Sequence, residues 1–237
     1  MSTTSSETST RPSLEHRSLP ALAIWLALAA VFTIGAFYGQ RQGNGAEDVL
    51  YEPEFAVVGV VSYAILVGLA VAVALFFERP RQALGFRSFE LRWLWWALGA
   101  VVATVVVSLV LEPFLHAGEE QGLAPAEWEP QHAEAFAANV GVAVLVGPFA
   151  EELFFRGLGI RVLGFLGGTT AIVGTALIFG LVHGLVVALP ALVFFGLGLG
   201  WVRLRSGSIW PSVLAHSAYN GLGVIILAIS WALDLTA

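Results

Sequence analysis

Three short polar segments interrupt an otherwise apolar sequence, and each carries side chains that can move protons. The segment Glu151–Arg156 reads EELFFR, Phe179–His183 reads FGLVH, and His216–Asn220 reads HSAYN. An ionisable side chain within a membrane segment is costly to bury, so it usually faces the interior of a helix bundle and marks function. These three segments are therefore the candidates for a functional site.

The two adjacent glutamates are expected to have different surroundings. On a helix, Glu152 and Arg156 lie four residues apart and can pair, whereas Glu151 points about 100° away from Glu152. One carboxylate would then be held by arginine while the other stays free for chemistry. Pro148 is expected to kink the helix and free a backbone carbonyl. A simpler interpretation is that the charges only mark the cytoplasmic end of this helix, because glutamates near an interface are tolerated.

The two histidine segments have simpler interpretations too. His183 could be a hydrogen-bonded packing residue, and Asn220 could form a hydrogen bond between helices. If the chain turns at Gly167, Glu151 and His183 each lie 16 residues from that turn and share a depth in the membrane. His216 would then lie about 10 Å shallower at 1.5 Å per residue. Bringing it level requires a tilted helix or a turn inside the bilayer.

Together these groups offer water-activation chemistry. A glutamate can act as general base while histidine or asparagine donors stabilise an oxyanion. Alternatively, Glu151, His183 and His216 form a His₂Glu set, which is a ligand composition of catalytic zinc sites. Glu152 would then be the base, although its pairing with Arg156 counts against that role. The residues alone leave both mechanisms open.

Composition predicts that the chain lies in a lipid bilayer. It is 57% hydrophobic and only 12% charged, whereas soluble domains are about 25% charged; its mean hydropathy is +0.82. The net charge of −6 argues against a nucleic-acid partner. The chain has no cysteine and all its basic residues are arginine, which excludes thiolate metal sites and both cysteine and lysine nucleophiles.

Charge-free stretches long enough to span a bilayer define the expected helices. They cover residues 20–40, 55–77, 93–111, 135–150, 161–203 with a turn near 183–190, and 206–233. We therefore predict an all-α, polytopic transmembrane bundle of about seven helices, with six or eight as alternatives. Residues 1–19 are expected to form a disordered cytoplasmic tail, residues 20–134 three helices with an acidic external loop, and residues 135–237 a core of about four helices.

Arginine distribution predicts the orientation of the bundle. In the seven-helix arrangement all arginines except Arg41 lie on one side, and the opposite loops, including residues 112–134, are acidic. The N-terminus is therefore expected in the cytoplasm. Trp93–Trp96 is expected to lie at the cytoplasmic interface, and Gly196 with Gly200 is expected to allow close helix packing.

The three polar segments resemble a known family. EExxxR, FxxxH and HxxxN, in this order on predicted membrane helices, are similar to the motifs of the CPBP family, the CAAX protease and bacteriocin-processing (Abi, type II CAAX prenyl endopeptidase) intramembrane proteases. The segment Gly200–His216 also resembles the family's lead-in to its last motif. The resemblance covers roughly residues 140–225, and the first three helices carry no family motif.

The resemblance implies an intramembrane endopeptidase, a hydrolase. Glu151, helped by His183, would activate the water that attacks the scissile carbonyl, and His216 and Asn220 would complete the water or oxyanion site. Family members are commonly described as metalloproteases, and a metal-free glutamate mechanism is also proposed for the fold. The resemblance therefore leaves two alternatives open, a divalent metal such as zinc or no cofactor. The supporting residues implied are Glu152, Arg156 and Phe179.

The expected partners are the lipid bilayer and a peptide or membrane-protein substrate. Eukaryotic members trim three residues from prenylated CAAX proteins, but an arginine-only composition rich in alanine, glycine and valine suggests a GC-rich bacterial genome, where prenylation is not expected. We therefore predict a multi-pass protein of the bacterial plasma membrane. The rival functions are a non-catalytic immunity or scaffold protein of the same fold and a proton-coupled transporter, which the lack of an internal repeat disfavours.

Overall fold

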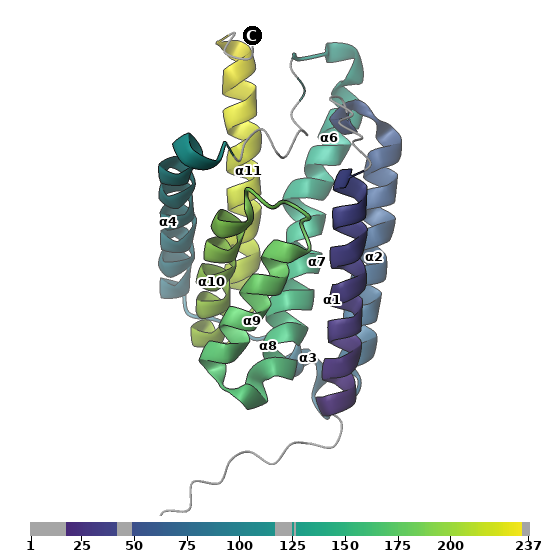
Figure 1. The fold of residues 1–237 in the computed structure, drawn as a ribbon, viewed down its shortest axis with the longest axis vertical. Coiled ribbons are helices and arrows are strands. Elements are labelled where there is room, and N and C mark those ends of the chain that lie inside the picture. The colour runs from purple at the N-terminus through teal and green to yellow at the C-terminus, as the bar shows by residue number, and fades with distance from the viewer. Residues whose placement is uncertain (1–17, 42–48, 117–124, 126, 234–237) are drawn as a thin grey trace, which may run out of the picture.

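The computed structural model describes residues 18–41, 49–116, 125 and 127–233, and Figure 1 shows that they form a bundle of helices. No strand occurs among these residues. The α-helices are α1 (Ser18–Arg41), α2 (Pro53–Ala74), α3 (Pro80–Ala83), α4 (Arg92–Leu115), α6 (Ala133–Gly141), α7 (Gly147–Glu152), α8 (Ile160–Leu163), α9 (Gly168–Leu181), α10 (Leu189–Ser206) and α11 (Trp210–Ala232). Two π-helical segments are η3 (Val142–Val146) and η4 (Leu153–Gly159), and three 3₁₀ turns are η1 (Val49–Tyr51), η2 (Pro130–His132) and η5 (Gly164–Leu166).

Five of the helical stretches in the described part of the chain are long and apolar enough to cross a membrane. They are α1, α2, α4, α11 and the continuous helix Pro130–Leu166, and α9 is a shorter apolar helix. With α9 and α10, these stretches account for the seven helices that the sequence predicts. The protein is thus an integral membrane protein with a polytopic helical bundle.

The glutamates lie on the continuous helix Pro130–Leu166, which we call the long helix and which is longer than predicted. The sequence predicts that the charged segment 151–156 ends it, but η4 and α8 continue it without a break through Leu163. Arg156, expected at its cytoplasmic end, is instead fully buried inside the bundle. A helix can continue past charged side chains when they pair with one another, which is what Glu152 and Arg156 do.

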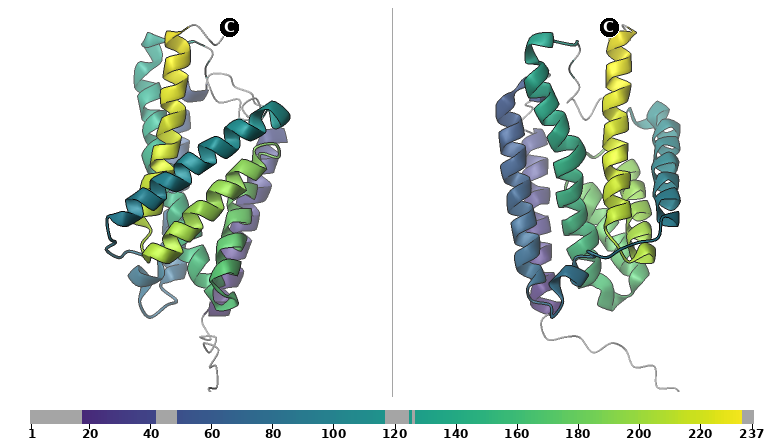
Figure 2. Two further views of the ribbon diagram at one scale, coloured as in Figure 1. Left: turned by 90° about the vertical axis from the view of Figure 1, so that its left-hand side faces the viewer. Right: turned by 180° about the vertical axis from the view of Figure 1, so that it is seen from behind.

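The helices share one core. In Figures 1 and 2, α1 and α2 lie beside the long helix on one side of the bundle, while α4 lies obliquely on the opposite side, against α10 and α11. A single cluster of buried apolar residues includes Trp25 of α1, Leu66 of α2, Phe154 of η4 and Leu199 of α10. The N-terminal helices therefore pack directly onto the segment that contains the three motifs.

Glycines let α10 approach its neighbours, as predicted. A Cβ atom at Gly196 would lie 2.9 Å from Ala176 Cα of α9, and one at Gly200 would lie 3.2 Å from Ile172 Cγ2 of the same helix. Small residues permit such contacts between membrane helices. The contact matters for the site, because α9 and α10 both pack against η4, which carries Arg156.

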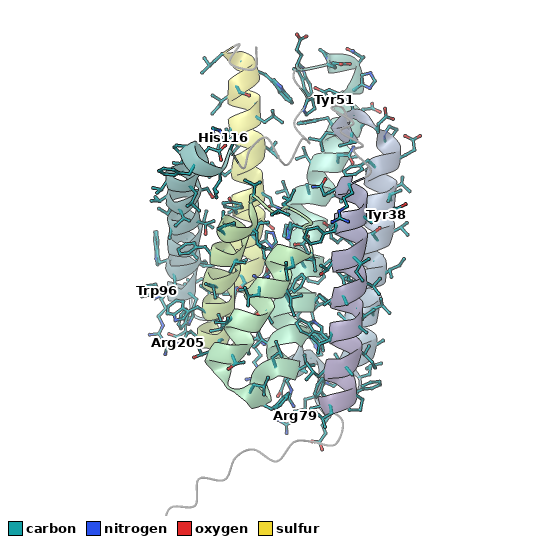
Figure 3. All side chains as sticks on the ribbon, in the orientation of Figure 1. Tyr38, Tyr51, Arg79, Trp96, His116 and Arg205 are labelled. Atoms are coloured by element: carbon teal, nitrogen blue, oxygen red, sulfur yellow. The ribbon has the colours of Figure 1, made fainter. Side chains whose placement is uncertain are left out.

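Two of the arginines from which the orientation is predicted lie at the same end of the bundle. Figure 3 places Arg79 and Arg205 at one end of the bundle and His116 toward the other. Near the arginine end, Trp93 and Trp96 pack edge-on against Trp201, with ring centroids 6.0 and 5.3 Å away. The cytoplasmic location of the arginine end stays a prediction.

Single cysteines can test this orientation, because the chain has none of its own. A cysteine replacing exposed Gln131 (Gln131→Cys) should react with a membrane-impermeant maleimide in intact cells. One replacing exposed Arg79 (Arg79→Cys) should react only after the membrane is permeabilised. The unmodified chain is the control and should not be labelled. The opposite pattern of labelling would contradict an N-terminus in the cytoplasm.

Candidate functional site

Glu151 lies at a point where three segments of the chain converge. It is carried by α7, His183 lies in the turn after α9, and His216 lies in the second turn of α11. Glu151 Oε2 is 3.9 Å from His183 Nε2 and 3.9 Å from His216 Nε2. This oxygen is buried and has no hydrogen-bond partner. The structure therefore brings together the three residues that the sequence places at the centre of the site.

Each histidine presents the same nitrogen to the carboxylate. His183 Nδ1 lies 2.7 Å from the Phe179 carbonyl oxygen, which can only accept, so this nitrogen carries the proton. His216 Nδ1 lies 3.1 Å from Glu152 Oε1 and donates to that carboxylate. In the neutral rings, both Nε2 atoms are then acceptors that face Glu151 Oε2. A distance of 3.9 Å is too long for a direct hydrogen bond, and such a gap between acceptors suits a bridging water.

The depth of His216 is explained by the turn before α11. In Figure 2 the turn between α10 and α11 lies further from the end of the bundle than the turn between α8 and α9, and α10 is tilted. Ser208 Oγ donates to the Arg87 carbonyl at 2.7 Å, and the Ile209 amide donates to the Gly85 carbonyl at 3.1 Å. These bonds hold the turn on the segment before α4. Because the two turns lie at different depths, His216 reaches the level of Glu151 and His183.

His183 is positioned by the end of α9. The helix stops at Leu181, and Gly184 has a φ of +69°, a left-handed conformation that glycine adopts without strain. A Cβ atom at Gly184 would lie 2.8 Å from the backbone of Ala36 on α1. The turn that carries His183 therefore packs against the first membrane helix.

Glu152 and Arg156 form the predicted ion pair, and it is completely buried. Glu152 Oε1 lies 3.1 Å from Arg156 Nη1, and both side chains have an exposed fraction of 0%. Arg156 Nη2 donates to the Gly196 carbonyl at 3.2 Å, and the guanidinium lies 4.3 Å from the centre of the Phe179 ring. Glu152 thus links Arg156 to His216, whose imidazole it orients.

Phe179 lies between the charged groups and the imidazoles. Its ring packs edge-on against His183 and His216, with centroid distances of 4.7 and 5.6 Å. A side chain that contacts both histidines and Arg156 restricts the orientation of all three. The expectation that Phe179 shapes the site fits these contacts.

Asn220 has a different contact from the other motif residues. Its Nδ2 donates to the Ala143 carbonyl at 2.8 Å, which lies two turns before Glu151 on the long helix. In η3 the hydrogen bonds join residues five apart, so the Gly147 amide donates to the Val142 carbonyl. By the same pattern the amide of residue 148 would donate to the Ala143 carbonyl, but residue 148 is proline and has no N–H. Pro148 therefore frees a carbonyl, as predicted, and Asn220 uses it to fasten α11 to the long helix.

Two residues that contact the site lie outside the three sequence motifs. Tyr63 of α2 donates its hydroxyl to Glu151 Oε1 at 3.1 Å. Trp25 of α1 is fully buried and donates its Nε1–H to the Phe154 carbonyl at 3.0 Å. In the sequence, Tyr63 is distinguished only by a hydroxyl in the middle of an apolar stretch. Nothing in the sequence distinguishes Trp25 from other residues of an apolar helix.

The zinc alternative finds no support in this arrangement. Within the part of the chain that the structure describes, no group of three or more His, Cys, Asp and Glu side chains has the geometry of a metal site. Glu151, His183 and His216 converge, with the carboxylate oxygen Oε2 3.9 Å from each imidazole Nε2.

The two glutamates should differ sharply in their effect on stability. Glu152→Gln leaves Arg156 buried without its counter-ion and should lower the free energy of unfolding by about 3–5 kcal/mol. Glu151→Gln keeps the shape of a side chain that has no ion-pair partner at hydrogen-bonding distance, and should cost much less. Unfolding of both purified variants in a mild detergent, followed by circular dichroism, measures the difference. Equal losses of stability would contradict the assigned division of roles.

One comparison with known proteins finds a match that covers the segment with the site. Residues 133–222 match the family described as type II CAAX prenyl endopeptidase Rce1-like. Neither a curated protein nor a solved structure matches the chain significantly. The matched segment contains all three motifs and excludes α1, α2 and α4. Residues 133–222 are thus similar to the Rce1-like protease family, the family that the motifs resemble.

Proposed function

We propose that this protein is an intramembrane endopeptidase that hydrolyses peptide bonds with a water molecule activated by Glu151 and His183. The observation that carries the proposal is the Glu151 Oε2 atom, which is buried, has no hydrogen-bond partner and faces two imidazole nitrogens at 3.9 Å. A buried polar atom without a partner requires an explanation, such as a catalytic role or a bound water, and the two imidazoles beside Glu151 Oε2 favour a catalytic role. The similarity of residues 133–222 to the Rce1-like protease family supports a hydrolase.

The first chemical step is the attack of water on the scissile carbonyl. A water between the two side chains donates one proton to Glu151 Oε2 and is oriented by the lone pair on His183 Nε2. As its oxygen bonds to the carbonyl carbon, Glu151 takes the proton and acts as general base. The Phe179 carbonyl holds the His183 ring in the required tautomer, since it accepts the Nδ1 proton at 2.7 Å.

The second step is collapse of the tetrahedral intermediate. Its oxyanion needs a hydrogen-bond donor, and the Asn220 amide of α11 is the proposed one. His216, whose Nδ1 proton is directed to Glu152 at 3.1 Å, completes the water site through Nε2. Protonated Glu151 then returns its proton to the leaving amine as the C–N bond breaks. Asn220 also aligns α11 with the long helix, because one N–H of its amide donates to the Ala143 carbonyl at 2.8 Å, and the amide has a second N–H for the oxyanion.

The proposed substrate is a peptide or membrane protein whose scissile bond reaches the interior of the bundle. The proposed location is the plasma membrane of a bacterium, as the arginine-only composition suggests. A non-catalytic immunity or scaffold protein and a proton-coupled transporter remain as outcomes of the test below.

Cleavage of a quenched peptide library by protein in lipid nanodiscs tests the proposal. Glu151→Gln and His183→Ala should each lower the rate by about 100-fold or more, because each removes a group that moves or orients the proton. Glu134→Gln is the matched control, since this glutamate lies exposed on α6 of the same long helix. Its rate should equal that of the wild type.

Each sample is also assayed with and without a strong chelator. Chelation should not change the wild-type rate if a glutamate-activated water carries out the reaction. Cleavage that survives in both site variants would show that the site is wrong. Folded wild-type protein that cleaves neither free peptides nor a membrane-embedded substrate would favour the scaffold, and proton-coupled flux in liposomes would favour the transporter.

A further inference from the structure

The carboxylate of Glu151 has two oxygens, and the structure treats them differently. Oε2 has no hydrogen-bond partner and faces the two imidazoles, whereas Oε1 accepts a 3.1 Å hydrogen bond from the Tyr63 hydroxyl. Tyr63 lies on α2, 88 residues away in sequence and outside the matched domain. We propose that Tyr63 is a positioning residue for the reaction, which acts by fixing the Glu151 carboxylate.

The backbone of the long helix is shaped to admit the Tyr63 ring. A Cβ atom at residue 147 would lie 2.9 Å from Tyr63 Oη and 3.0 Å from Cζ, so only glycine fits there without displacing the ring. Gly147 is the first residue of α7 and lies four residues, about one turn, before Glu151. The ring also packs against the buried core and is therefore held in place independently of its hydroxyl.

Fixing this carboxylate has a chemical consequence. The last torsion of a glutamate side chain is broad and roughly two-fold, so an unrestrained carboxylate samples many orientations. The Tyr63 hydroxyl can donate to only one oxygen, and this contact leaves the other directed at His183 and His216. A general base must lie within hydrogen-bond reach of the proton that it abstracts. Tyr63 therefore raises the fraction of time in which Oε2 is in that position.

The same contact makes α2 part of the catalytic unit. The matched segment supplies the carboxylate and both imidazoles, but the donor that orients the carboxylate comes from a helix before it. This inference rests on the proposed function, because positioning matters only if Glu151 is the base. Its experiment must therefore separate a failure of the Tyr63 contact from a failure of the function.

Kinetics of Tyr63→Phe provide the first part of the test. This variant keeps the ring and removes only the hydroxyl, so kcat should fall about 10- to 100-fold, the range expected for loss of a hydrogen bond to a charged group, while KM stays within about twofold. Tyr38→Phe is the matched control, because Tyr38 is 66% exposed on α1. It should leave both constants unchanged. A purely structural role for Tyr63 would instead lower the thermal midpoint without this separation of kcat from KM.

Displacement of the ring by a methyl group provides the second part. Gly147→Ala should reproduce the loss in kcat, because the new Cβ atom pushes Tyr63 away from Glu151. Gly141→Ala, on the same long helix, is the control, since nothing lies within 4 Å of a Cβ atom there. Loss of kcat in Gly141→Ala as well would overturn the explanation through Tyr63.

An infrared measurement decides the contact without activity. Protein labelled with ¹³C-carboxyl glutamate gives a band for Glu151, isolated as the difference between wild type and Glu151→Gln. Tyr63→Phe should shift this band, whereas an unchanged band overturns the proposed contact. If Glu151→Gln is inactive and Tyr63→Phe keeps full kcat, the positioning role is wrong and the proposed function stands. If Glu151→Gln keeps full activity, the proposed function fails and the positioning role fails with it.

Discussion

Burial of the Arg156 guanidinium is the constraint on which the rest of the site depends. A charge removed from water must be compensated by a counter-ion and by hydrogen bonds, and removal of either partner is strongly destabilising. Glu152 supplies the opposite charge at 3.1 Å, the Gly196 carbonyl accepts a hydrogen bond from Nη2, and the Phe179 ring lies beside the guanidinium. Arg156 Nε has no hydrogen-bond partner among the described residues. Because Glu152 also accepts from His216, the compensation that stabilises the buried arginine fixes the imidazole of the site. The neighbouring Glu151 is left with one oxygen without a hydrogen bond.

Departures from regular α-helix around α7 give the site its second set of constraints. Two π-helical segments flank the glutamates, and π-bulges are frequent at functional sites because they re-aim side chains. Ala143 and Phe154, within those segments, offer carbonyls to side chains of other helices. Asn220 of α11 and Trp25 of α1 donate to them at 2.8 and 3.0 Å. The irregular backbone is thus fastened to the bundle from both sides of the glutamates.

Much of the fold and site was predictable, because lipid imposes simple rules. Apolar stretches located the membrane helices, and the spacing of Glu152 and Arg156 identified their ion pair. The helix end expected at the charged segment 151–156 was wrong, because charge was taken to mean exposure, whereas here paired charges lie inside. The depth of His216 depended on a turn held by distant backbone carbonyls, and no local pattern encodes such contacts. Tyr63 was missed for the same reason, since a lone tyrosine in an apolar stretch does not reveal its partner.

The proposed mechanism places a water molecule between Glu151 Oε2 and the two imidazoles. An experimental structure at a resolution that shows ordered waters, with anomalous data collected at the zinc edge, would reveal it. One density peak should lie within about 2.6–3.2 Å of Glu151 Oε2 and His183 Nε2, with no anomalous signal. A peak about 2.0–2.2 Å from the same atoms with a zinc signal, or a direct protein hydrogen bond to Oε2, would contradict the mechanism.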